Sequence, residues 1–265
     1  MTVMTAEPPT ASERASAPGP RPIRASAPVS AEPPTRQGPL LAVCGVTGGV
    51  GTTTLTYLIA LAATREWADP VLVADTGGPT GGLSACADVE VLRSLPELAE
   101  QLDRGKPLGA GIYATRDDGL RVLASGPSFS SPDVGDELGL LLAHAREAHG
   151  LTVIDCGTLA RRADQAAAAT ATHVAWVLPA NRAGVKRGSR ILDAAPRLFG
   201  KQLLVARSDP GHTKAPLRDL RRLAGERRAL LVLMPHLSRL ARGQVDDSAK
   251  EAQVPVHAIL GAVRR

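Results

Sequence analysis

The chain has 265 residues, enough for one sizeable α/β domain and too few for a second domain of comparable size. Hydrophobic residues make up 44% of the chain and aromatic residues only 2%, so the core must consist mainly of Ala, Val and Leu side chains. The formal net charge of +5 permits contact with nucleic acid or with an anionic membrane surface, but it requires neither.

The first 37 residues differ in composition from the rest of the chain. Residues 1–37 are rich in Pro, Ala, Ser, Thr and Glu and contain almost no large apolar side chain. Such a segment cannot bury enough surface to offset the entropy lost on ordering. We therefore expect a disordered tail at 1–37, with a PxxP-like partner site as the alternative, and a folded domain at 38–265.

The folded domain is predicted to begin with a strand, a glycine-rich turn and a helix. Residues 40–46 (LLAVCGV) form a continuous apolar run, which is typical of a parallel strand covered on both faces. After the turn, residues 53–64 have the length and the apolar spacing of a helix. Pro70 then precedes a second short strand, VLVAD, which ends at Asp75. This order predicts a strand, loop, helix, strand unit.

Strands and helices continue to alternate through the rest of the chain. Parallel neighbours need a crossover connection, and helices supply it. The predicted fold class is therefore α/β, with a doubly wound, mostly parallel sheet and helices on both faces. Further strands are expected at 119–126, 151–155, 173–180, 201–208 and 228–235, and helices at 94–104, 133–149, 163–170, 184–198 and in a segment ending at Gly225.

The turn between the first strand and the first helix has the composition of a phosphate-binding loop. In the run GVTGGVGTTT, which begins at Gly45, glycines let the backbone curl so that successive N–H groups point inward, and the following helix start adds positive potential. A plain tight turn is the alternative interpretation. The predicted nucleotide-binding residues are Thr47, Gly48, Gly49, Val50, Gly51, Thr52, Thr53 and Thr54.

Two aspartates end apolar strands and strengthen this interpretation. In a parallel sheet, Asp75 and Asp155 are expected at the same edge as the glycine-rich turn. Thr53 and Asp155 are the predicted Mg²⁺ ligands, Asp155 acting directly or through water. Asp75 is expected to orient an attacking water, so both acids are candidate catalytic residues. The alternative is that the two aspartates only cap the next helices.

The turn and the two acids resemble the deviant Walker A family of MinD, ParA and their relatives, whose loop reads KGGxGKT. The run TGGVGTTT, from Thr47, matches the glycines and the final hydroxyl of that loop. The loop is most similar to that of CpaE/TadZ-like proteins, which are associated with pilus assembly, and the resemblance covers most of residues 40–260. It implies a P-loop fold, ATP and Mg²⁺ as cofactors, a homodimer, and protein partners in a pilus, secretion or cell-division apparatus.

Several positions depart from the family pattern. Both Walker A lysines are replaced by threonine, the signature lysine by Thr47 and the lysine before the hydroxyl residue by Thr52. Ala206 stands where the family often carries a base-reading Asn, and Gly77 replaces a second acid. Each lost lysine removes a charge-assisted contact to developing phosphate charge. The departures therefore predict slow or absent ATP hydrolysis.

Three functions are compatible with these residues. The first is a MinD/ParA-like scaffold or degenerate ATPase that positions or assembles a pilus or secretion apparatus through contacts. The second is a slow Mg-ATPase in septum placement or DNA partition, with an arginine or a partner's residue in place of lysine. The third is a dinucleotide-binding Rossmann-type protein, although Thr54 stands where its GxGxxG pattern needs glycine.

The surfaces and the location of the protein are predicted from the remaining sequence. No signal-peptide pattern and no apolar run of about 18 residues is found, which predicts a cytoplasmic protein. The C-terminal run HAILGAVRR is a candidate for contact with the inner face of a membrane. The basic cluster at 214–228 is either a solvated helix face or a patch that binds DNA.

Overall fold

The computed structural model describes the folded domain over several ranges with gaps between them. The predicted tail lies outside the described residues up to position 36, so its disorder stays a prediction, and Gly77 also lies outside them. The described residues are 37–76, 82–90, 93–105, 112–116, 118–125, 136–195, 200–208, 216–240 and 244–265.

In the described part of the chain, eight strands form one sheet in the order β3-β4-β2-β5-β1-β6-β7-β8. All neighbouring strands are parallel except β3 and β4, which pair antiparallel at the edge. The predicted fold class is therefore confirmed. The strands are β1 (Leu40–Gly45), β2 (Val71–Asp75), β3 (Ala114–Thr115), β4 (Arg121–Leu123), β5 (Leu151–Asp155), β6 (His173–Pro179), β7 (Lys201–Arg207) and β8 (Leu230–Met234).

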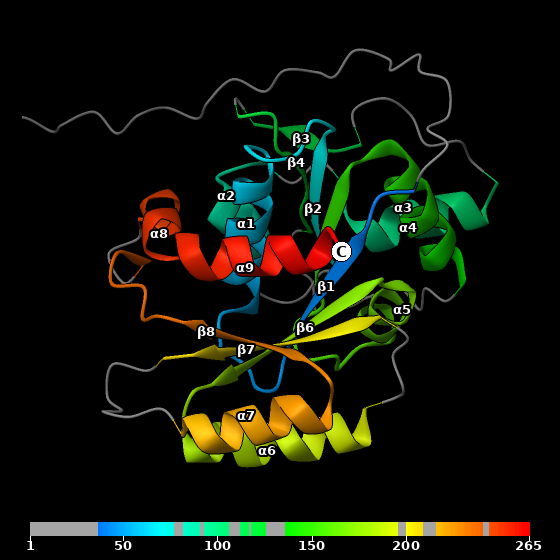
Figure 1. Cartoon of the computed structure of the whole chain (residues 1–265). Coiled ribbons are helices and arrows are strands. Elements are labelled where there is room, and N and C mark those ends of the chain that lie inside the picture. Colours follow the sequence, from blue (N-terminus) through cyan, green and yellow to red (C-terminus); the bar gives the residue numbers. More distant parts are fainter. Residues whose placement is uncertain are drawn as a thin grey trace, which may run out of the picture.

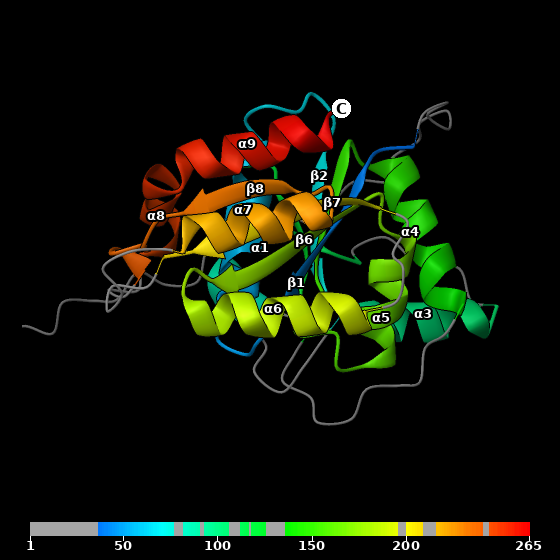
Figure 2. The same ribbon diagram turned by 60° about the horizontal axis from the view of Figure 1, so that its bottom comes forward.

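Helices cover both faces of this sheet, as Figures 1 and 2 show. The helices α1 and α9 pack on one face, and α4, α5, α6 and α7 pack on the other, with α6 and α7 side by side. The helices are α1 (Thr52–Ala63), α2 (Gly82–Ala87), α3 (Leu95–Asp103), α4 (Asp136–Ala148), α5 (Arg162–Thr170), α6 (Arg182–Ala194), α7 (Leu217–Glu226), α8 (Val245–Glu251) and α9 (Gln253–Val263).

The central strand β1 is buried from end to end because it lies between two layers of helices. Its side chains alternate, so that Leu41 and Val43 join the core on the α1 side while Ala42 and Cys44 join the core on the opposite side. Neither side needs a polar residue, which explains why the sequence of β1 is continuously apolar. The carboxyl end of β1 therefore opens into the glycine-rich turn near the middle of the sheet.

The structure differs from the sequence-based expectation in several elements. Helix α2, strand β3 and helices α8 and α9 were not expected, and the strand expected at 119–126 is shortened to β4. The C-terminal run lies in α9, which buries Ile259, Leu260 and Val263 in the core beside α1 and β8, so these three side chains are not available to enter a membrane surface. Pro255 lies in the first turn of α9, where a missing N–H breaks no helical hydrogen bond.

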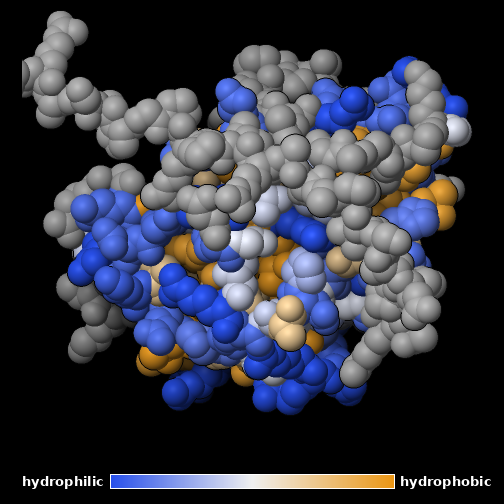
Figure 3. Space-filling view, turned by 90° about the horizontal axis from the view of Figure 1, so that it is seen from above, coloured by the Kyte–Doolittle hydropathy of each residue, from blue (hydrophilic) through white to orange (hydrophobic). Residues whose placement is uncertain are grey.

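Among the helices of the described ranges, none has both the length and the apolar character needed to cross a membrane. On the face shown in Figure 3, hydrophilic side chains predominate among the described residues, and apolar ones reach the surface in small separate areas.

Helix α6 lies close to the sheet because two of its own residues that face the sheet are glycines. A Cβ at Gly184 would collide with the carbonyl oxygen of Pro179, and a Cβ at Gly188 would lie 3.3 Å from a methyl group of Leu178. Asn181 caps the helix by accepting a hydrogen bond from the Gly184 N–H at 2.7 Å. These contacts fix the position of α6 against the end of β6.

We expect Gly184→Ala to lower the free energy of unfolding by about 1–3 kcal/mol, because the new methyl group must push α6 away from the Pro179 carbonyl. Chemical denaturation of the purified protein measures the change. Gly261→Ala on α9 is the matched control, since nothing lies within 4 Å of its Cβ position, and it should keep or slightly raise stability. Equal stability of the Gly184 variant and the unaltered chain would contradict the packing argument.

Candidate functional site

The start of the loop that follows β1 is fixed by two backbone hydrogen bonds. The Gly45 N–H donates to the Gly157 carbonyl at 2.6 Å, and the Val46 N–H donates to the Val177 carbonyl at 3.0 Å. These bonds attach the loop to the segment after β5 and to β6, the two neighbours of β1. Gly51 then enters α1 with a φ of 90°, a conformation that favours glycine.

The backbone amides of this loop are left without acceptors. From Thr47 to Thr54, no backbone N–H donates a hydrogen bond to an acceptor in the described ranges. The first helical bond of α1 runs from the Leu55 N–H to the Gly51 carbonyl at 3.0 Å. A row of unbonded N–H groups around a glycine turn is an arrangement that binds anions.

The amino end of α1 is also uncapped, in contrast to those of α3 and α6. No side chain caps it and no acidic residue occupies its first turn. Helix α3, by comparison, begins with a Ser94–Glu97 capping box, and α6 begins with an Asn181 cap. The positive end of the α1 dipole therefore faces the loop without compensation from the protein. A negatively charged ligand would supply the missing acceptors.

Asp155 ends β5 beside this loop, as the sequence predicts. The Thr53 hydroxyl donates to one of its carboxylate oxygens and the Gly157 N–H donates to the other at 3.0 Å. Burial raises the pKa of the Asp155 carboxyl above its usual value, and the bonds from Thr53 and Gly157 only partly oppose that effect. No Lys or Arg of the described residues forms an ion pair with Asp155. A cation bound here would therefore compensate a buried negative charge.

Asp75 lies next to Asp155 at the same edge of the sheet. Strands β2 and β5 pair in parallel with Asp75 opposite Asp155, so the prediction that the two acids share one edge is confirmed. One Asp75 oxygen accepts a hydrogen bond from the Ser125 N–H at 2.9 Å, which holds the end of β4. Asp155 does not cap the next described helix, because its carboxylate bonds to Thr53 and Gly157 while Arg161 is the N-cap residue of α5.

A buried polar network that was not predicted from the sequence connects the segment after β2 with the segment after β5. Asp164, on α5, accepts hydrogen bonds from the Thr76 hydroxyl and from the Arg161 guanidinium, the latter at 2.7 Å. The same guanidinium donates to the Thr76 hydroxyl at 3.0 Å. This network ties the residue after Asp75 to the segment after Asp155, and it keeps the two strand ends together.

Two arginines from distant parts of the chain reach the loop. Arg187, on α6, donates to the Thr47 hydroxyl at 2.8 Å, and Arg207, at the end of β7, donates to the Val50 carbonyl at 3.0 Å. A guanidinium nitrogen of Arg207 also lies 2.9 Å from the Cβ position of Gly51. The sequence suggested an arginine in place of lysine but could not select one, because Arg187 is 140 residues from Thr47.

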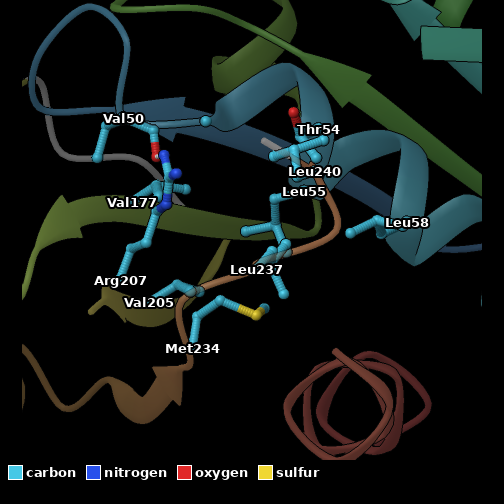
Figure 4. Close-up of a pocket in the computed structure, with 11 residues that line it drawn as sticks. Val50, Thr54, Leu55, Leu58, Val177, Val205, Arg207, Met234, Leu237 and Leu240 are labelled. Atoms are coloured by element: carbon cyan, nitrogen blue, oxygen red, sulfur yellow. Dashed lines mark hydrogen bonds between the residues drawn. The ribbon is translucent and has the colours of Figure 1, made fainter. Parts of the chain in front are cut away.

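A mostly apolar hollow adjoins the loop, and Figure 4 shows Arg207 extending along its edge from β7 toward Val50. Ala206, at the position of the expected base-reading Asn, is fully buried and contributes no polar group. The segment after β8 closes the opposite side with Leu237 and Leu240. The lining residues are Val50, Gly51, Thr54, Leu55, Leu58, Val177, Val205, Arg207, Met234, Leu237 and Leu240.

The site thus combines unbonded amides, a hydroxyl-carboxylate pair and an apolar hollow. Within the described part of the chain, no group of three or more His, Cys, Asp or Glu side chains is placed to hold a metal ion. A cation at Thr53 and Asp155 would therefore need further ligands from water or from a bound anion.

Comparison with known proteins identifies the fold. No protein-family model matches the chain. No curated protein matches it either. Among solved structures, it is similar to the ParA family ATPase from Chlorobium tepidum, with a TM-score of 0.66 and 14% identity over 82% of this chain and 92% of that one.

Two further solved structures have the same fold. Apo McdA from Cyanothece gives a TM-score of 0.69 at 15% identity, covering 85% of this chain and 99% of that one. The septum site-determining protein MinD from Pyrococcus horikoshii, complexed with Mg-ADP, gives 0.63 at 16% identity, covering 83% and 93%. At these identities the likeness concerns the arrangement of the backbone, and the chain has the P-loop fold of the ParA and MinD ATPases.

Proposed function

We propose that this chain is a MinD/ParA-like protein that binds a magnesium nucleotide at the loop, hydrolyses it slowly if at all, and acts through contacts with partner proteins. The observation that carries the proposal is the set of unbonded amides from Thr47 to Thr54 at the uncapped start of α1, beside the Thr53–Asp155 pair. An anion at that place satisfies the amides, and a cation compensates Asp155.

Each part of the site has a role in this proposal. The amides of residues 47–54 hold the phosphates, and Thr53 and Asp155 hold Mg²⁺, which would neutralise phosphate charge. Asp75 orients water near the phosphates, and its bond from Ser125 fixes its direction. The base is placed beside Arg207 at the mouth of the apolar hollow, which must widen to admit it. None of the described residues that line the hollow is Asn or Gln, so the hollow offers no side-chain amide to select the base.

Slow turnover follows from the neutral loop. Thr47 and Thr52 occupy the positions of the two lysines in the resembling family. A threonine hydroxyl cannot compensate the charge that develops on a transferred phosphoryl group as an ammonium does. The second candidate, a slow but working Mg-ATPase, has one supporting observation, namely that the cations Arg187 and Arg207 reach the loop from outside it.

The proposed cellular role is to position or assemble a pilus or secretion apparatus, as the CpaE/TadZ-like resemblance suggests. A homodimer and protein partners of that apparatus belong to the proposal, and septum placement or DNA partition belongs to the second candidate. The basic cluster at 214–228 gives little support to a DNA surface, because some of its arginines lie near acids of the same chain. Arg222 lies near both Asp219 and Glu226. Arg227 forms an ion pair with Asp193 of α6. These contacts fit a solvated helix face.

The order of the strands disfavours the dinucleotide-binding alternative. In a Rossmann sheet the first two strands of the nucleotide-binding unit are neighbours. Here β5 lies between β1 and β2. The acid at the end of β2 is therefore one strand away from the glycine turn, and it does not lie where a ribose would be held.

Calorimetric titration with Mg-ATP, together with phosphate release, tests the proposal. We expect magnesium-dependent binding of ATP with a sub-millimolar Kd. The rate of phosphate release by the unaltered chain should be close to the rate measured for Asp155→Ala, because the loop lacks lysine. Asp155→Ala should remove the magnesium-dependent part of the affinity, and Asp219→Ala, on α7, is the control that should not. Lack of binding at millimolar Mg-ATP would refute the proposal, and release that depends on Asp155 would favour the slow ATPase.

Asp155→Asn should raise the stability of the ligand-free protein while weakening magnesium-dependent binding. The raised pKa of Asp155 means that folding favours the neutral carboxyl, so the charged form lowers stability as pH rises through that pKa. Removing the charge should therefore raise the free energy of unfolding at neutral pH by about 0.5–2 kcal/mol. Denaturation at pH 7 measures the difference, and a destabilised variant would show that the negative charge is already compensated.

Deletion of the gene in its host organism tests the cellular role. We expect fewer assembled surface pili or less secretion through the apparatus, restored by the unaltered chain. Normal pili and secretion combined with misplaced septa or lost DNA would instead support the second candidate.

A further inference from the structure

We propose that Arg187 supplies, from helix α6 of the same chain, the cation that the phosphate loop lacks, and that it contacts the terminal phosphate of a bound nucleoside triphosphate. This inference rests on the proposed function, because it needs a phosphate at the loop. It implies that Arg187, which lies outside the loop, lets the site distinguish a nucleoside triphosphate from a diphosphate.

The position of Arg187 is the first argument. Its guanidinium donates to the hydroxyl of Thr47 at 2.8 Å, and Thr47 begins the run of unbonded amides. The charge therefore lies at the start of the loop, within one side-chain length of the N–H groups that would hold a phosphate. The loop itself contains no lysine or arginine from Gly45 to Thr54.

The packing of α6 is the second argument, because it fixes where Arg187 can reach. Gly188, the next residue, has its Cβ position 4.0 Å from a methyl group of Val46 in the loop. Gly184, one turn earlier, lies directly against the Pro179 carbonyl. A helix held this closely brings the base of the Arg187 side chain to the loop, so only the end of that side chain needs to reorient when a ligand binds.

The lack of a charged partner is the third argument. In the described ranges no carboxylate lies within ion-pair distance of Arg187, whereas Arg161 and Arg227 are paired with Asp164 and Asp193. The Thr47 hydroxyl is a neutral acceptor and occupies one of the five N–H donors that a guanidinium carries. The remaining donors have the planar arrangement that binds phosphate oxygens in pairs.

Arg207 reaches the loop at a different place. Its guanidinium is bonded to the Val50 carbonyl and covers Gly51 at the edge of the apolar hollow, on the side where the base is proposed to lie. Arg187 instead lies at the Thr47 end of the loop. The two arginines therefore bracket the loop, and only Arg187 is assigned to the terminal phosphate.

The test is calorimetric titration of the full chain with Mg-ATP and with Mg-ADP. Arg187→Ala should weaken Mg-ATP binding about tenfold or more, since it removes a charge-assisted contact, and should change Mg-ADP binding less than threefold. Arg187→Lys should recover part of the loss. Arg190→Ala removes an exposed arginine of the same helix, has no assigned role in the site, and should leave both affinities unchanged.

Thr47→Val separates a direct contact from an indirect one. If Arg187 touches phosphate, the valine variant should affect ATP and ADP alike, because it keeps the amide and the arginine. If Arg187 only steadies the loop through Thr47, then Thr47→Val and Arg187→Ala will weaken Mg-ATP binding by the same factor and will also weaken Mg-ADP binding by that factor. That result refutes the proposal. Equal binding of Mg-ATP by Arg187→Ala and the unaltered chain overturns this inference alone. Absence of Mg-ATP binding by the unaltered chain overturns the proposed function and the inference with it.

Discussion

The feature on which the site depends is the uncapped amino end of α1. Eight consecutive residues, from Thr47 to Thr54, offer backbone N–H groups that find no acceptor in the described part of the chain. The protein supplies neither a capping side chain nor an acidic residue in the first turn. Because unbonded amides at a helix start are stabilised by an anion, this end of the sheet is organised for a ligand that the chain itself does not provide.

The surrounding structure serves to hold that loop in place. The β1 strand lies at the centre of the sheet, and bonds to the Gly157 and Val177 carbonyls fasten the loop to both neighbouring strands. Hydrogen bonds from Thr53 and Gly157 hold the Asp155 carboxylate beside the loop. Burial raises the pKa of this carboxyl, so its charged form lowers the stability of the fold unless a cation compensates it. The Thr76–Arg161–Asp164 network then joins the two strand ends that carry the acids.

Much of this arrangement could be predicted from the sequence, because it depends on local patterns. Continuous apolar runs separated by helical segments predict a parallel sheet, and the parallel sheet places Asp75 and Asp155 at one edge. The order of the strands could not be predicted, since nothing in the β2 or β5 sequence states that β5 separates β2 from β1. Arg187 could not be selected from the other arginines, because its contact with Thr47 depends on how closely Gly184 and Gly188 let α6 approach. The packing of the C-terminal run could not be predicted either, because it depends on contacts of its apolar side chains with α1 and β8.

The most direct test of the central claim is the amide proton and nitrogen NMR spectrum of the loop during titration with Mg-ATP. The amide signals of Gly48, Gly49 and Gly51 should shift strongly and saturate together, since their N–H groups gain acceptors that the free protein lacks. Amides of α9 on the same face of the sheet, such as that of Gly261, should hardly move. Loop signals that stay unchanged while Mg-ATP binds elsewhere, or that do not change at all, would contradict the account.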